Sequence, residues 1–249
     1  MHFHRGSARY LVLRALEGHI SFQFVVLTTI VLFWIVLLLI AYMLGLRLYY
    51  HLKQTYRARR RKLYDPAIEM VLLEEPFEKI LEALRPKRWG DAEIVQEVML
   101  DSMDQLIGSP FETLQRAAFE LGIVERNLKM LKSKVKLRRG KAMEALGIMR
   151  IFPAVVPILQ ILPKQTKDMK LVALRALARI GDPKTLPYFV RTASALPPAM
   201  LPRLASLMLE FGAPALPAIK TLVSQNSKAF PPRVLQLLLA ETAIAQETR

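Results

Sequence analysis

Basic side chains are densest in one short run, Arg126–Lys141, with the sequence RNLKMLKSKVKLRRGK. Eight of its sixteen residues are Lys or Arg, and none is acidic. Such a run can attract an acidic protein, an anionic lipid surface or nucleic acid, because each of these presents clustered negative charge. The candidate partner- or lipid-binding residues are therefore Arg126, Lys129, Lys132, Lys134, Lys136, Arg138, Arg139 and Lys141.

Three interpretations of this run remain open. Residues 63–125 carry 5 basic and 14 acidic residues, whereas residues 126–191 carry 16 basic and 3 acidic ones. The run is a solvated face compensated by the neighbouring acidic segment, a docking surface for an acidic partner or the anionic inner leaflet, or a nucleic-acid site. The third interpretation is the weakest, since no aromatic residue lies among the basic ones to stack on bases.

Catalytic chemistry has few candidates in this chain. It has no cysteine, which excludes thiolate nucleophiles, thiolate metal sites and disulfides. His2 and His4 are too few ligands for a metal site, and no histidine follows His51, so a Ser-His-Asp arrangement is impossible in the C-terminal three quarters. Acidic pairs such as Asp101 and Asp104 are typical of a solvated helix face. We expect no enzyme, no cofactor and no metal.

The basic run belongs to a chain that also carries a long apolar stretch, Ile20–Leu46. This stretch contains no charged residue. A helix needs about 20 apolar residues to cross the hydrocarbon core of a bilayer. The stretch exceeds the roughly 7–15 apolar residues of a cleaved signal peptide, and no A-x-A pattern closes it. The sequence predicts a short N-terminal tail at residues 1–19 and a transmembrane helix at residues 20–46.

Basic residues on the two sides of the span predict its orientation. Three Lys or Arg precede it and seven follow it up to Lys62. The positive-inside rule then places the N-terminus outside and the remaining chain in the cytoplasm, and we expect a single-pass protein of the bacterial inner membrane. A basic juxtamembrane helix is expected at 47–64; it is either a topology signal alone or a lipid- or partner-binding segment through Arg57, Arg59, Arg60, Arg61 and Lys62.

Ala41 and Gly45 lie four residues apart near the cytoplasmic end of the span. Small residues at this spacing allow transmembrane helices to pack closely. The motif is short and common, so a passive anchor is the alternative.

The C-terminal half repeats itself at a spacing of 30–31 residues. Ile180-Gly181 recurs as Phe211-Gly212, Pro202-Arg203-Leu204 recurs as Pro232-Arg233-Val234, and Ala145-Leu146 precedes a second Ala-Leu pair at 176–177. Self-similarity of this period indicates stacked helical hairpins, none of which can close a core alone. The apolar residues expected to face inward in the first helix of one hairpin are Leu171, Leu174, Leu177 and Ala178.

The turn within that hairpin is Gly181-Asp182-Pro183. Glycine suits the left-handed residue at a helix C-terminus, aspartate can cap the next helix, and proline fits a first helical turn. Followed by a second proline at Pro187, the turn resembles the HEAT repeat, and more narrowly the bacterial HEAT-like repeats also found in phycobilin lyases. The resemblance covers residues 141–243 and is most specific at 180–187; Arg150-Ile151-Phe152 and Ala213 stand where Gly-Asp would be expected.

This resemblance implies an all-α fold, a transmembrane helix followed by an α-solenoid, with degenerate or capping repeats at 65–136 and HEAT-like repeats at 137–249. No lyase catalytic residue is matched. We expect a membrane-anchored, non-catalytic scaffold that binds a partner protein at the cytoplasmic face, another inner-membrane protein. Resemblance to anchored repeat proteins extends this to an envelope or polysaccharide-assembly (glycosyltransferase) complex. The alternative is an electrostatic binder of anionic lipid or nucleic acid through Arg126–Lys141.

Overall fold

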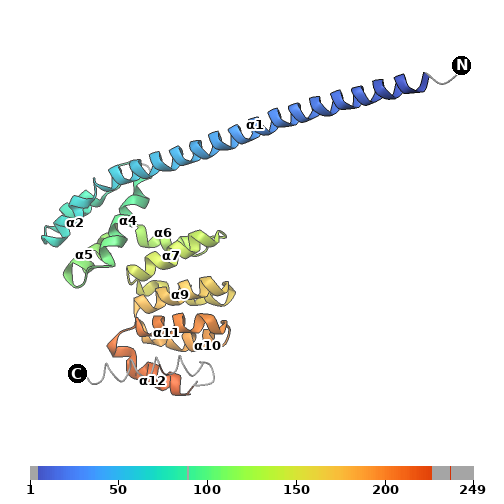
Figure 1. Cartoon of the computed structure of the whole chain (residues 1–249). Helices are drawn as coiled ribbons and strands as arrows, with labels where there is room; N and C mark the ends of the chain where they lie inside the picture. The colour runs from blue at the N-terminus through green and yellow to red at the C-terminus, as the bar shows by residue number, and fades with distance from the viewer. Residues whose placement is uncertain (1–4, 89, 226–235, 237–249) are drawn as a thin grey trace. The chain divides into compact units, whose positions relative to one another are not determined.

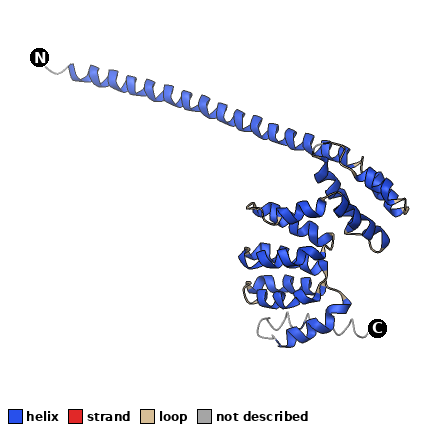
Figure 2. Cartoon of the chain, turned by 180° about the vertical axis from the view of Figure 1, so that it is seen from behind, coloured by secondary structure: helices blue, strands red, loops and turns tan. Residues whose placement is uncertain are grey.

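The computed structural model describes residues 5–88, 90–225 and 236, and side chains from residue 26 onward except at 213. All regular elements in this part of the chain are helices, as predicted (Figure 2). His2, His4 and the repeat copy at 232–234 lie outside the described residues. The chain divides into two compact units, residues 1–60 and 61–249, and each is described by itself.

The first unit is formed by helix α1, Arg5–Arg61, which is 57 residues long and whose last residue already belongs to the second unit (Figure 1). The helix runs without a break from residue 5 through the apolar stretch and the basic juxtamembrane residues. Every side chain from Val26 to Leu46 is exposed, although nearly all of them are apolar. Within the described residues, α1 is the helix that is long and apolar enough to cross a membrane, which confirms the predicted apolar span in this respect.

The second unit begins with five helices packed around apolar side chains. They are α2 (Asp65–Leu72), α3 (Phe77–Leu84), α4 (Asp91–Met103), α5 (Ser109–Glu120) and α6 (Ile123–Met130). The first turns of α2 and α5 contain Pro66 and Pro110, where the missing N–H costs no helical hydrogen bond. These helices lie within residues 65–136, where degenerate or capping repeats were expected.

Tyr64 fixes the start of this unit. Its ring is fully buried, and its hydroxyl donates a hydrogen bond to Oδ2 of Asp91 at 2.7 Å. The same hydroxyl accepts a hydrogen bond from the backbone N–H of Lys87 at 3.1 Å. Asp91 is only 2% exposed at the first turn of α4, so its carboxylate depends on protein donors rather than on water.

Three helix pairs follow, each built from a helix, a short 3-10 turn and a second helix. The second helices α8, α10 and α12 begin at Val155, Leu186 and Leu216, which are 31 and 30 residues apart and so follow the sequence period. Helix α7 contacts α9, and α9 contacts α11 (Figure 1). The pairs are α7 (Lys136–Ile148) with α8 (Val155–Ile161), α9 (Lys167–Ile180) with α10 (Leu186–Ala193), and α11 (Leu201–Leu209) with α12 (Leu216–Gln225).

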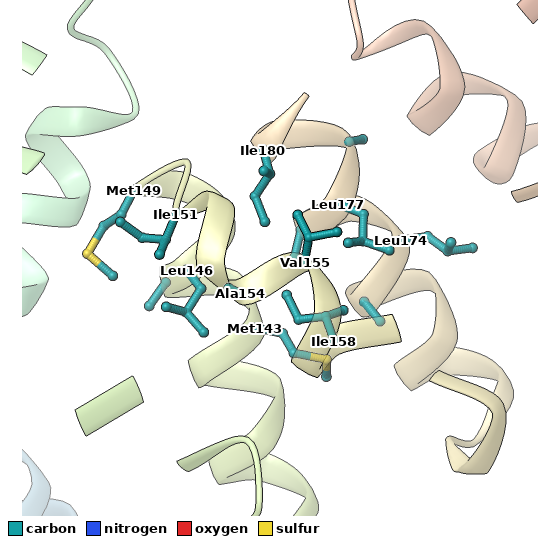
Figure 3. Packing of buried hydrophobic residues seen from close by; sticks show 14 of the residues in the cluster. Met143, Leu146, Met149, Ile151, Ala154, Val155, Ile158, Leu174, Leu177 and Ile180 are labelled. Atoms are coloured by element: carbon teal, nitrogen blue, oxygen red, sulfur yellow. The ribbon is translucent and has the colours of Figure 1, made fainter. Parts of the chain in front are cut away.

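A shared apolar core joins the first two pairs. In Figure 3, side chains from α7, the following turn, α8 and α9 point toward one another. The inward stripe expected on α9 is buried: Leu174 and Leu177 are 0% exposed, and Leu171 and Ala178 are also buried. The labelled members of this core are Met143, Leu146, Met149, Ile151, Ala154, Val155, Ile158, Leu174, Leu177 and Ile180.

The turn between α9 and α10 has the predicted chemistry. Gly181 takes a left-handed conformation with φ +79° at the C-terminus of α9. The Asp182 carboxylate accepts a hydrogen bond from the backbone N–H of Lys184 at 3.0 Å, and Pro183 is the first residue of the 3-10 turn. This turn therefore ends one helix and caps the next with adjacent residues.

Arg150 occupies the equivalent left-handed position after α7, with φ +52°. The N–H of Ile151 bonds the carbonyl of Leu146, and the N–H of Arg150 bonds that of Gly147, which is the Schellman pattern of helix termination. The guanidinium carbon of Arg150 lies 4.8 Å from the ring centroid of Phe111 on α5. The first pair therefore keeps the backbone turn of the others with a residue for which this conformation is strained.

We predict that Arg150→Gly is more stable than Arg150→Ala by roughly 0.5–1 kcal/mol, the reverse of their order within a helix. Both variants lose the contact with Phe111, so their difference isolates the cost of a Cβ at positive φ. Urea unfolding of the full-length variants in nanodiscs, followed by circular dichroism, measures it. An alanine variant as stable as the glycine variant would contradict the left-handed assignment.

Candidate functional site

The eight predicted basic residues lie on α6, on the connection 131–135 and on the first turns of α7. The structure divides them into two sets with different surroundings. Arg126 and Arg139 are half-buried and hydrogen-bonded within the protein, whereas the other six are exposed. The run is therefore not a uniform charged surface.

Arg126 joins α6 to α4. Its Nη2 donates to Oε1 of Gln96 at 2.8 Å and to the carbonyl of Ala92 at 3.1 Å. Asn127, which is buried, donates to the same Gln96 oxygen at 3.1 Å. Burial lowers the pKa of the Arg126 guanidinium, and the negative charge of Glu93 partly opposes this effect. Arg126 thus stabilises helix packing rather than offering a free charge.

Arg139 closes the connection that precedes α7. Its Nη1 donates to the carbonyls of Ser133 and Lys134, at 2.7 and 3.1 Å. Its Nη2 donates to Oε1 of Gln165 at 3.2 Å, which links α7 to the segment before α9. A guanidinium with several donors in one plane can bridge these groups, and a lysine could not.

The remaining six define what we term the basic surface: Lys129, Lys132, Lys134, Lys136, Arg138 and Lys141. Two acidic residues, Glu120 and Glu125, line the same hollow as Lys129 and Arg138. Asp101 binds Arg61 at 2.7 Å, and Asp104 binds Arg179 at 3.1 Å. With the described residues as possible partners, no side chain of the basic surface forms an ion pair or a hydrogen bond. Direct ion pairs with the acidic segment therefore do not neutralise this charge.

Two aliphatic side chains lie within the basic surface. Val135 is 50% exposed and Leu137 is 69% exposed, with basic residues on both sides of each in the chain. The sequence predicted a purely electrostatic run, and these two residues were missed. Val135 is the N-cap of α7 and Leu137 lies in its first turn, and two residues at this spacing form no periodic pattern from which exposure could be inferred.

A cavity of about 490 Å³ opens across α7, α9 and the start of α11. It is lined by one helix from each of the three pairs, so it forms only when α7, α9 and α11 pack side by side. The repeat period predicted helical hairpins but not this cavity, because its wall comes from residues up to about sixty positions apart. The lining residues are Glu144, Asp168, Leu171, Val172, Arg175, Ala176, Arg179, Ala199, Met200, Arg203 and Leu207.

The cavity wall combines apolar side chains with charges of both signs. Arg179 is paired with Asp104, and Arg175 lies 3.9 Å from Glu210, a long and partly exposed ion pair. Arg203 is exposed and has no ion-pair partner in the described part of the chain. The arrangement suits a partner that fills an apolar hollow and also makes charged hydrogen bonds at its edge.

The residues predicted to act at the membrane lie on α1 or next to its end. Ala41 and Gly45 are exposed on the apolar stretch, and a Cβ placed on Gly45 would meet nothing within 4 Å. Arg57 and Arg59 are exposed, Arg60 and Arg61 are half-buried, and Lys62, immediately after the helix, is exposed. Close helix packing through Ala41 and Gly45 thus stays a prediction.

The described residues contain no group of three His, Asp or Glu side chains placed to hold a metal ion. The acidic pair Asp101 and Asp104 is divided between two arginines, Arg61 and Arg179, so its carboxylates do not converge on one point. Comparison with protein-family models, with curated proteins and with solved structures found nothing that matches this chain.

Proposed function

We propose that this protein is a membrane-anchored, non-catalytic adaptor whose HEAT-like helix pairs form an α-solenoid that binds a partner protein. Helix α1 holds it in a bacterial inner membrane, with the N-terminus outside and the helix pairs in the cytoplasm, as the basic residues after the span favour. The observation that carries the proposal is the cavity across α7, α9 and α11. Three successive first helices contribute to it, as expected for the binding face of a stacked array.

The cavity fits an amphipathic protein segment. Its apolar wall, with Val172 and Met200 both half-buried, can receive hydrophobic side chains of a helix or turn. Its charges of both signs, with exposed Arg203 and Asp168, provide contacts along the polar side of such a segment. Binding there needs no catalytic group.

Anchoring in the membrane favours a partner that is itself a membrane protein. A span in the same bilayer confines both proteins to two dimensions and raises their effective concentration, so a modest affinity is sufficient. The partner we propose is another inner-membrane protein. A polysaccharide-assembly complex with a glycosyltransferase is the candidate suggested by the resemblance to anchored repeat proteins.

Filling the cavity should abolish partner binding. Ala199 is exposed at its rim, and a tryptophan there would occupy the hollow without entering the core. We expect Ala199→Trp to recover at most about a tenth of the partner obtained with the parent protein, a change of about 1.4 kcal/mol or more. Affinity purification of full-length protein in mild detergent, with mass spectrometry, measures this.

Ala218→Trp is the matched control, because Ala218 is an exposed alanine on α12 outside the cavity. It should retain the partner. A chimaera that carries residues 61–249 on an unrelated transmembrane anchor locates recognition in the helix pairs if the partner is retained. Loss of the partner only with the exchanged anchor would move recognition to α1, and no reproducible partner with the parent protein or the chimaera would refute the proposal.

A further inference from the structure

Two exposed aliphatic residues alternate along the chain with members of the basic surface. Val135 and Leu137 are 50% and 69% exposed, and Lys134, Lys136 and Arg138 alternate with them along the chain. A solvated charged face needs no exposed aliphatic pair, and exposing such side chains to water is unfavourable. The combination is typical of a segment that enters the boundary of a bilayer, where aliphatic groups meet acyl chains and cations meet headgroups.

The segment is held in shape by its own hydrogen bonds. Arg139 donates to the carbonyls of Ser133 and Lys134, at 2.7 and 3.1 Å. The hydroxyl of Ser133 accepts a hydrogen bond from the N–H of Val135 at 3.2 Å. The connection before α7 is therefore preorganised, and binding a surface through it costs little further ordering.

Helix α7 also starts without the usual compensation of its N-terminus. Its N-cap, Val135, offers no side-chain cap, and its first turn has no acidic residue. Lys136, Arg138 and Arg139 instead add positive charge at the positive end of the helix dipole, which is unfavourable in isolation. Anionic headgroups next to this turn would relieve that repulsion.

We propose that the basic surface, together with Val135 and Leu137, is a second membrane contact that binds an anionic bilayer surface. Aliphatic side chains favour lipid over nucleic acid, because they cannot stack on bases as aromatic rings do. The candidate membrane span in the same chain supplies a bilayer that this surface can meet. This second contact rests on the membrane anchoring of the proposed function but not on its partner protein.

The test exploits the absence of cysteine. Lys134→Cys in the full-length protein accepts an environment-sensitive fluorophore at one position only. The protein is reconstituted into vesicles of phosphatidylcholine alone or with a third of phosphatidylglycerol, each with and without a nitroxide-labelled lipid. We expect the nitroxide to quench the fluorophore in anionic vesicles, and at least about fivefold less in neutral vesicles or at high salt.

Two variants of the labelled protein separate the contribution of the aliphatic side chains from that of the positive charges. Val135→Ser with Leu137→Ser removes the aliphatic side chains, and Lys132→Gln, Lys136→Gln and Arg138→Gln remove charge; each set should reduce quenching by at least about fivefold. Lys164→Gln, Lys167→Gln and Lys184→Gln form the matched control, since these three exposed lysines lie outside the basic surface. That control should leave quenching unchanged.

Three results would overturn the inference. One is no quenching in anionic vesicles, and another is equal loss of quenching in the control variant. The third is a fluorophore that responds only to an added oligonucleotide, which would assign the surface to nucleic acid. Partner recovery through the α7–α9–α11 cavity is a separate readout, so failure here and failure of the proposed function are distinguishable.

Discussion

Gly147→Ala is expected to destabilise the helix pairs by roughly 1–3 kcal/mol, although alanine is the better helix former. A Cβ on Gly147 would lie 2.7 Å from Cα of Ala176 and 3.2 Å from its carbonyl oxygen. These are backbone atoms of α9, and they cannot move aside without moving the helix. The added methyl group therefore forces α7 and α9 apart along a closely packed contact.

Gly140→Ala is the matched control on the same helix. A Cβ there meets the terminal methyl carbon of Met169 at 3.3 Å, the end of a flexible side chain that can rotate away. This variant should be neutral or stabilised by up to about 1 kcal/mol through helix propensity. Urea unfolding of both full-length variants in nanodiscs decides the matter, and equal stability would mean that α7 and α9 do not approach so closely.

Tyr64→Phe is the second change with a large expected effect, a loss of roughly 1.5–3 kcal/mol. The substitution keeps the buried ring and removes only the hydroxyl. That hydroxyl donates to Asp91 at 2.7 Å, and Asp91 is 2% exposed. A buried carboxylate that loses a donor cannot recover it from water, so the cost exceeds that of an exposed hydrogen bond.

Tyr188→Phe provides the comparison, because Tyr188 on α10 is 39% exposed and water can replace its hydrogen bonds. Its stability should change by less than about 0.5 kcal/mol. Both variants are measured by urea unfolding in nanodiscs with unchanged lipid. A Tyr64 variant as stable as the Tyr188 variant would show that Asp91 is satisfied without the hydroxyl.

Local chemistry made part of this structure predictable. Gly181, Asp182 and Pro183 each perform a task set by backbone geometry within a few residues, so the turn could be inferred from the sequence. The apolar stretch of α1 was equally clear, since its length and lack of charge are themselves the signal. The inward stripe on α9 followed from helical periodicity and is buried as expected.

Features that depend on distant residues could not be predicted in this way. Arg126 and Arg139 looked like free charges because their partners Gln96 and Gln165 are 30 and 26 residues away. Nothing in the chemistry of Arg150 signals a left-handed conformation; the repeat pattern placed Arg150-Ile151-Phe152 at the Gly-Asp turn but did not say which of the three would take it. The cavity escaped prediction for the same reason, as three separate helices build its wall.

The order of contacts among the helix pairs has a consequence for how the protein opens. Helix α9 lies between α7 and α11, and the shared core continues from one pair to the next. Local unfolding that starts at α11 can then stop at α9, because each helix pair is stabilised by contacts with its immediate neighbours. A ligand that contacts Glu144, Val172 and Arg203 together would stabilise the packed state of all three helix pairs, because a pair could separate only after the ligand dissociates. Occupancy of the cavity would thus make the three helix pairs unfold together rather than one at a time.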